Sequence, residues 1–142
     1  MNLKGWYMRE SDNWRTPSKL YEKFIKYGWY DPCPINPTKD GLTSEWQQKN
    51  FVNPPYSNLK AWIHKAIEEH KKSKAVVLLI PARTDTQAFK TIVEYGAEIT
   101  FITGRLKFND KGSAPFPSCI IYLTGTKTHF NLIDREELLK DN

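Results

Sequence analysis

The sequence predicts an α/β fold with a single open sheet in which most strands are parallel. Residues 75–80 form an unbroken apolar run between Lys74 and Pro81, which is typical of a strand buried on both faces. Residues 59–67, before this run, carry apolar side chains at helical spacing, and a second helical segment follows the run. Strands that alternate with helices favour parallel, right-handed crossovers.

The 142 residues suffice for one domain with a single core. We expect residues 1–13 to form an N-terminal arm and residues 134–142 a flexible tail. An aromatic content of 13% argues against a disordered chain, and the net charge of +5 suits a polyanionic partner without identifying one.

Cys33 and Cys119 are the only cysteines and no Cys/His cluster occurs, so neither a metal site nor a disulfide scaffold is indicated. The sequence shows no signal-peptide pattern and no apolar run of membrane length, which predicts a cytoplasmic protein.

The first predicted helix covers residues 18–27, with Thr16 as its expected cap and Pro17 at an early helical position. This helix N-terminus is either an ordinary cap or a seat for the carboxylate of a cofactor. Residues 29–31 predict a short strand that ends at Asp31. A carboxylate there can pair with an ammonium group, accept a hydrogen bond from a ribose hydroxyl, or simply belong to a turn.

The 21 residues between Asp31 and Asn53 are polar and rich in turn formers. A complete βαβ unit takes roughly 30 residues. This half of the sheet is therefore expected to be reduced to loop with at most one short strand.

The second half of the chain is expected to complete the sheet. A helix over residues 86–95, with Asp85 as its candidate cap, leads to a strand at 98–102. The last predicted strand covers residues 119–123. Because no helix separates these two strands, we expect the last one to be antiparallel.

The tetrapeptide Asn53-Pro54-Pro55-Tyr56 lies between a strand and a helix that Ser57 can cap. Consecutive prolines continue neither element, because they lack N–H groups and have a fixed φ. The turn therefore lies at a strand end, where open α/β sheets bind ligands. It offers the Asn53 amide oxygen and main-chain carbonyls as acceptors, with the Tyr56 ring beside them. A planar molecule with an amino group, such as adenine, fits these features; a plain rigid connection is the alternative.

The tetrapeptide resembles the catalytic motif of amino-group DNA methyltransferases. From about residue 13 to residue 123, the whole chain is similar to the phage-type, Dam-related DNA N6-adenine methyltransferases. The segments that carry the similarity are residues 14–17, 31–33, 40–42 with Trp46, 53–57, Trp62 with 65–66, 79–86 and 104–108. The resemblance implies a reduced, Rossmann-like methyltransferase fold in a single domain, with S-adenosylmethionine as cofactor.

The resemblance also implies three groups of site residues. Those expected at the cofactor are Trp14, Thr16, Pro17, Asp31, Pro32, Cys33 and Asn53. Those expected to be catalytic are Asn53, Pro54, Pro55 and Tyr56. Those expected at the DNA are Tyr56, Arg83, Arg105, Lys107 and Phe108.

The implied reaction moves a methyl group from S-adenosylmethionine to N6 of an adenine flipped out of double-stranded DNA. Acceptors at Asn53 and Pro54 would hold the amino group and direct its lone pair at the methyl carbon, with no metal and no covalent intermediate. Cytosine N4, adenine in RNA, and an inert DNA-binding relic of the fold are the alternatives.

The chain departs from larger enzymes of this kind in two ways. It has no FxGxG-like cofactor loop, and it has no insertion large enough for a target-recognition domain. Sequence specificity is then either relaxed or supplied by the N-terminal arm, by residues 109–115, or by a second subunit in a homodimer. A phage or prophage origin would place the protein in a bacterial host, with protection against restriction as a natural purpose.

Overall fold

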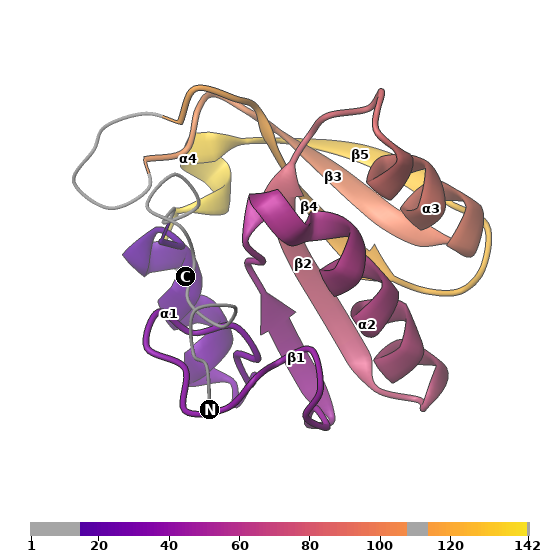
Figure 1. Cartoon of the computed structure of the whole chain (residues 1–142). Helices are drawn as coiled ribbons and strands as arrows, with labels where there is room; N and C mark the ends of the chain where they lie inside the picture. Colours follow the sequence, from indigo (N-terminus) through magenta and orange to yellow (C-terminus); the bar gives the residue numbers. More distant parts are fainter. Residues whose placement is uncertain (1–14, 108–113, 142) are drawn as a thin grey trace.

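The computed structural model describes residues 15–107 and 114–141 (Figure 1). In this part of the chain the strands form one five-stranded sheet with the order β1-β2-β4-β3-β5. The strands are β1 (Lys49–Val52), β2 (Ala75–Pro81), β3 (Ala97–Thr103), β4 (Ser118–Leu123) and β5 (His129–Asp134). The α/β fold class predicted from the sequence is confirmed.

Within the described residues, β4 is the strand that runs against the others. β1 pairs parallel with β2, and β3 pairs parallel with β5, whereas β4 is antiparallel to both β2 and β3. The antiparallel direction of this strand was predicted correctly. Its position between β2 and β3 had not been predicted. The remaining four strands point the same way, so their carboxyl ends meet at one edge of the sheet.

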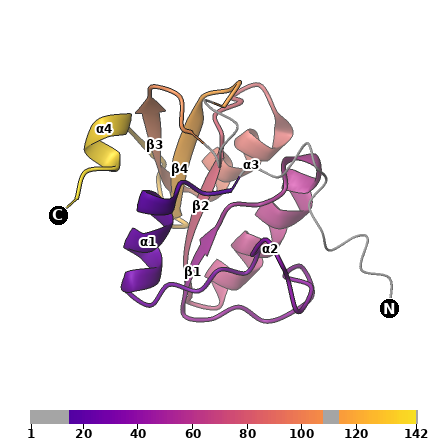
Figure 2. The same ribbon diagram turned by 90° about the vertical axis from the view of Figure 1, so that its left-hand side faces the viewer.

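Helices cover both faces of the sheet and give three layers (Figures 1 and 2). The helical segments are α1 (Ser18–Lys26), the 3-10 turn η3 (Tyr56–Asn58), α2 (Leu59–Lys71), α3 (Gln87–Tyr95) and α4 (Arg135–Leu138). On β2, Leu78 and Ile80 belong to the core beneath α2 and α3, while Val77 and Leu79 belong to the core beneath α1. Burial on both faces explains the unbroken apolar run of this strand.

Three predicted helix caps were wrong. Thr16 does not cap α1, whose N-cap residue is Pro17 and has no side-chain cap hydrogen bond. Ser57 lies inside η3, and α2 follows it with Asn58 as its N-cap residue. At α3 the capping side chain is Thr86, which accepts from the Phe89 N–H, and not Asp85. In each case the expected residue lay one position before the N-cap residue of the helix.

The strand predicted at residues 29–31 is reduced to a single parallel bridge between Tyr30 and Asn50. The Tyr30 N–H donates to the Lys49 carbonyl, and the Phe51 N–H donates to the Tyr30 carbonyl. This bridge still places Asp31 next to the carboxyl end of β1, as a full strand would have done.

The end of the chain also differs from prediction. Residues 134–142 were expected to form a flexible tail, but Asp134 ends β5 and Arg135–Leu138 form α4. β5 itself, at the edge of the sheet, was not predicted. The antiparallel strand is therefore not the C-terminal one. α4 is attached to α1 by Lys23, whose ammonium group donates to the Leu138 carbonyl at 2.7 Å.

The loop after Asp31 is held against α2. A side chain on Gly41 would meet the Pro32 carbonyl at 2.2 Å and the Trp62 ring at 2.6 Å, so only glycine fits this contact. The Trp46 indole N–H donates to the Gly41 carbonyl at 2.7 Å. These contacts fix the segment that carries Asp31 and Cys33.

Candidate functional site

Asn53 stands at the carboxyl end of β1, and two neighbouring hydroxyl groups fix its side chain. Its amide nitrogen donates to the Thr16 hydroxyl at 3.2 Å, and its amide oxygen accepts from the Tyr56 hydroxyl at 3.4 Å. Thr16 lies 37 residues away in sequence, so this bond joins the start of α1 to the tip of β1. It also gives Thr16 a role other than the cap that the sequence predicted.

The two prolines of the tetrapeptide shape the turn. Pro54 is buried and Pro55 is partly buried. Pro55 is extended, with φ −65° and ψ 129°, and its carbonyl accepts from the Asn58 N–H. The chain therefore leaves β1 in an extended conformation and tightens into η3, which presents Asn53 and Tyr56 on the same side of the turn.

Asp31 is partly buried and forms two hydrogen bonds. One carboxylate oxygen accepts from the Cys33 N–H at 2.8 Å, and the other accepts from the Tyr21 hydroxyl at 3.2 Å. Burial raises the pKa of Asp31 above its usual value, against the lowering effect of these two bonds. Burial and the nearby Asp31 charge raise the pKa of both Tyr21 and Cys33 to about 12.

These residues line one cavity of about 360 Å³. Of the residues expected at the cofactor, its lining contains Thr16, Asp31, Cys33 and Asn53. The other two that the structure describes, Pro17 and Pro32, do not line it, and Pro32 is buried with its carbonyl against Gly41. Trp14 lies outside the described residues. Four residues from three separate segments are thus brought together.

An aromatic pair continues the site from Tyr56. The Phe116 ring meets the Tyr56 ring edge to face, with centroids 5.2 Å apart, and the Arg83 guanidinium lies 5.6 Å from the Phe116 centroid. The predicted Arg83 is therefore linked to Tyr56 through Phe116. Phe116 itself, which is buried, was not predicted as a site residue.

The remaining residues expected at the DNA lie farther along the same sheet edge. Arg105 is exposed, and its carbonyl accepts from the Arg135 guanidinium at 3.1 Å. Lys107 lines a second cavity of about 700 Å³, which shares Arg15 and Thr16 with the first. Phe108 lies outside the described residues.

Sequence reasoning missed Tyr21 and Phe116. Tyr21 lies within the first predicted helix, and nothing in its local sequence indicates that its hydroxyl reaches Asp31. Phe116 precedes β4 and reaches Tyr56 only because that strand is inserted beside β2. Neither contact could be predicted from the local sequence, because both depend on the tertiary fold.

Among the described residues, no three side chains of the types that bind metals gather into a potential metal site. None of the helices described has the length and apolar character needed to cross a membrane.

The fold is that of an α/β protein with a cavity at the carboxyl ends of its strands, beside an Asn-Pro-Pro-Tyr turn. The chain belongs to the DNA N-6-adenine-methyltransferase (Dam) family, whose family model matches residues 7–129. It is also 35% identical over 71 residues to the DNA N-6-adenine-methyltransferase of Haemophilus phage HP1. That match covers 49% of this chain, which spans only 41% of the phage protein.

A solved structure also resembles the chain. It is the crystal structure of a predicted O-methyltransferase from Agrobacterium tumefaciens, at 18% identity and a TM-score of 0.39. The likeness covers 67% of this chain and 44% of the other.

Proposed function

We propose that this protein transfers a methyl group from S-adenosylmethionine to the N6 amino group of adenine in DNA. The observation that carries the proposal is the fixed position of Asn53 between Thr16 and Tyr56, at the wall of the cavity that Asp31 also lines. Membership of the Dam family supports the same reaction.

The lining of the cavity fits the proposed cofactor. Its volume of about 360 Å³ falls in the range of roughly 300–1,000 Å³ found for small-ligand sites. Asp31 can pair with the ammonium group or accept from a ribose hydroxyl, and the α1 N-terminus, without a side-chain cap, can bind the carboxylate. S-adenosylmethionine would supply a methyl group made electrophilic by its sulfonium.

The residues of the turn would act on the adenine. The lone pair of the N6 nitrogen is delocalised into the ring, which makes this nitrogen a poor nucleophile. The Asn53 amide oxygen has two lone pairs and so accepts from more than one donor; it and the Pro54 carbonyl would hold the N6 hydrogens. As positive charge develops on N6, these fixed dipoles stabilise the transition state more than the ground state.

Tyr56 would hold the ring of the target base. A base in a duplex cannot reach a site at the sheet edge, so it must leave the helix and stack on an aromatic group. The edge-to-face contact with Phe116 keeps the Tyr56 ring in one orientation. Arg83, which lies over Phe116, would contact a phosphate beside the flipped nucleotide.

The test is methyl transfer from labelled S-adenosylmethionine to unmethylated duplex DNA, followed by mass spectrometry of the nucleosides. Wild-type protein should produce N6-methyladenine, whereas Asn53→Ala should lower the rate by roughly 100-fold or more, because it removes a transition-state acceptor. Asn53→Asp keeps an oxygen at the same place and is the matched control, expected to retain more activity than Asn53→Ala.

Each remaining outcome selects a different function. N4-methylcytosine would keep the mechanism and change the base, and labelled RNA alone would change the nucleic acid. Cofactor binding without transfer to DNA or RNA would leave an inert DNA-binding protein. If the reaction is as proposed, the phage relative suggests the cytoplasm of a bacterial host as its place, and light scattering would show whether the active form is a homodimer.

A further inference from the structure

The second cavity described above opens between the start of α1, the segment at Lys107, and α4. Its volume is about 700 Å³, and it joins the smaller cavity through shared lining residues, among them Arg15 and Thr16. Because Thr16 is also bonded to Asn53, the groove begins next to the proposed catalytic turn. We call this larger cavity the α1–α4 groove.

The α1–α4 groove is strongly basic. Its described lining contains five cationic side chains and one carboxylate, that of Glu136. The cations are Arg15, Lys19, Lys107, Arg135 and Lys140. They come from three segments far apart in sequence, so the fold itself gathers them.

The ion pairs around the groove leave this charge largely uncompensated. Arg135 lies 3.9 Å from the Glu136 carboxylate and Lys140 lies 4.0 Å from that of Glu137. Both contacts are at the limit for an ion pair, and both acidic side chains are mostly exposed, so these pairs are weak. For Lys19 and Lys107, no carboxylate of the described residues lies within ion-pair distance.

We propose that the α1–α4 groove binds the phosphates of the DNA strand that carries the target adenine. This inference rests on the proposed function and extends it to a path for the strand, including Lys19 and Lys140, which the sequence did not indicate. Spread cations beside a catalytic turn suit a polyanionic backbone, because each phosphate contact releases a counterion. The phosphate contacts fix position without reading sequence.

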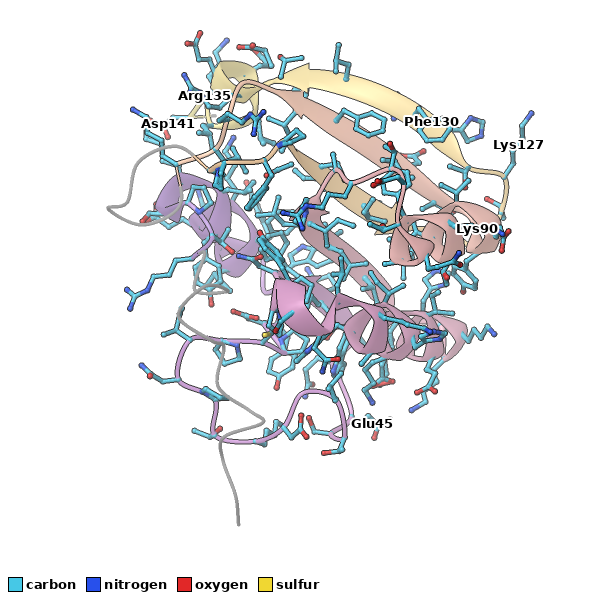
Figure 3. All side chains as sticks on the ribbon, turned by 45° about the horizontal axis from the view of Figure 1, so that its top comes forward. Glu45, Lys90, Lys127, Phe130, Arg135 and Asp141 are labelled. Atoms are coloured by element: carbon cyan, nitrogen blue, oxygen red, sulfur yellow. The ribbon has the colours of Figure 1, made fainter. Side chains whose placement is uncertain are left out.

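The test measures how DNA affinity depends on salt. Lys19→Gln/Lys140→Gln changes two exposed groove lysines, while Lys90→Gln/Lys127→Gln removes the same charge far from Arg135 at the opposite end of the molecule (Figure 3). Arg15 is left intact because it lines both cavities. Binding of each variant to a short duplex is measured by fluorescence anisotropy over a range of salt concentrations, after melting curves confirm that the variants are folded.

For the groove variant, the slope of log affinity against log salt should become shallower by about 2, close to 1 for each lost phosphate contact. The control variant should keep the wild-type slope. In methylation assays the groove variant should also show a higher KM for DNA. Lys107→Gln should lower the slope by about 1 on its own, which provides a second reading from another segment.

An equal slope change in the control variant, or none in either variant, would overturn the proposal. So would a change seen with an RNA hairpin and not with DNA. Because the binding measurement needs no turnover, the groove proposal and the proposed methyl transfer can be refuted independently of each other. A wild-type protein that binds through the groove but methylates nothing would refute the proposed function and retain the groove.

Discussion

Two carboxylates in this protein, the buried Glu69 and the partly buried Asp31, are held in opposite ways. Glu69 of α2 is fully buried, with the Trp46 N–H at 2.6 Å and the ammonium groups of Lys72 and Lys74 at 3.1 and 3.3 Å. Burial acts to raise its pKa, but the hydrogen bonds and charges of these partners outweigh burial and lower the pKa to about 2. Asp31 accepts from two neutral donors, the Cys33 N–H and the Tyr21 hydroxyl, and burial raises its pKa.

The difference separates a structural carboxylate from one suited to a ligand. Glu69 has its compensating charges built into the chain, and they attach the loop before β1 to α2. Among the described residues, no cationic group lies within ion-pair distance of Asp31, although Asp31 lines a cavity. A buried carboxylate without a cation has an unfavourable charged form, and a cationic ligand in the cavity would relieve this cost.

The largest expected effect is a loss of unfolding free energy when the charge of Glu69 is removed. Glu69→Gln removes the buried counter-charge of Lys74, which is 8% exposed, and leaves Lys74 with the exposed Glu45 carboxylate at 3.3 Å. This should cost roughly 3–5 kcal/mol of unfolding free energy, as when one partner of a buried pair is removed. Urea unfolding followed by circular dichroism measures this loss. Glu68→Gln on the exposed side of α2 is the control and should stay within about 0.5 kcal/mol of wild type.

Glu69 also makes the unfolding free energy of the wild-type protein depend on pH. Since the pKa of Glu69 is about 2 in the fold against 4.5 in the unfolded chain, its stabilisation is present above pH 4.5 and is lost as the pH falls toward 2. Glu69→Gln should lack this part of the acid-dependent loss. If the unfolding free energy of Glu69→Gln fell with pH as that of the wild type does, Glu69 would not be the group responsible.

Asp31→Asn should have the opposite signature. The amide avoids burying a charge, so the unfolding midpoint should stay equal or rise. Affinity for S-adenosylmethionine, measured by calorimetry, should fall by roughly 1.5–3 kcal/mol, the range for a hydrogen bond to a charged group. Asp85→Asn, on an exposed side chain, should change neither quantity. A destabilised Asp31→Asn with normal affinity would make Asp31 a structural residue like Glu69.

The pH dependence of cofactor affinity sharpens this test. The pKa of Asp31 is raised in the free protein, and a cationic ligand favours the ionised form. Affinity should therefore weaken as the pH falls through this raised pKa, beginning at a higher pH than for an ordinary carboxyl group. Asp31→Asn should bind weakly with no such dependence.

The sequence predicts the interior of this fold better than its edges. Residues 75–80 and the helical face at 59–67 carry their periodicity in the chain because each is buried against several neighbours. β5 gave no such signal, since most of its side chains are exposed, with Phe130 57% and Leu132 71% exposed. Its pairing is decided by the neighbouring β3. An edge strand with so few buried side chains carries little hydrophobic pattern of its own, and its register is only weakly specified by its sequence.

The site shows the same division. The rigid turn at Asn53 was predictable because two prolines constrain it locally. Asp31 was predictable because it follows a short extended segment, which the structure reduces to the bridge between Tyr30 and Asn50. The partners that complete the site were not predictable: Thr16 resembled a helix cap and Phe116 a residue before a strand. Their contacts with Asn53 and Tyr56 join segments far apart in the chain, and the sequence carries no local record of them.

The smallest expected effect concerns Thr16, which distinguishes a positioning contact from a merely structural one. Thr16→Val keeps the shape but removes the acceptor of the Asn53 amide hydrogens, so about 0.5–1.5 kcal/mol of positioning should be lost. That loss corresponds to a roughly 2- to 13-fold lower kcat, from a transition state that relies on a fixed Asn53 oxygen. Thr16→Ser retains the hydroxyl and should restore most of the rate. If Thr16→Val instead raised only the KM for the cofactor, Thr16 would act on the cavity wall and not through Asn53.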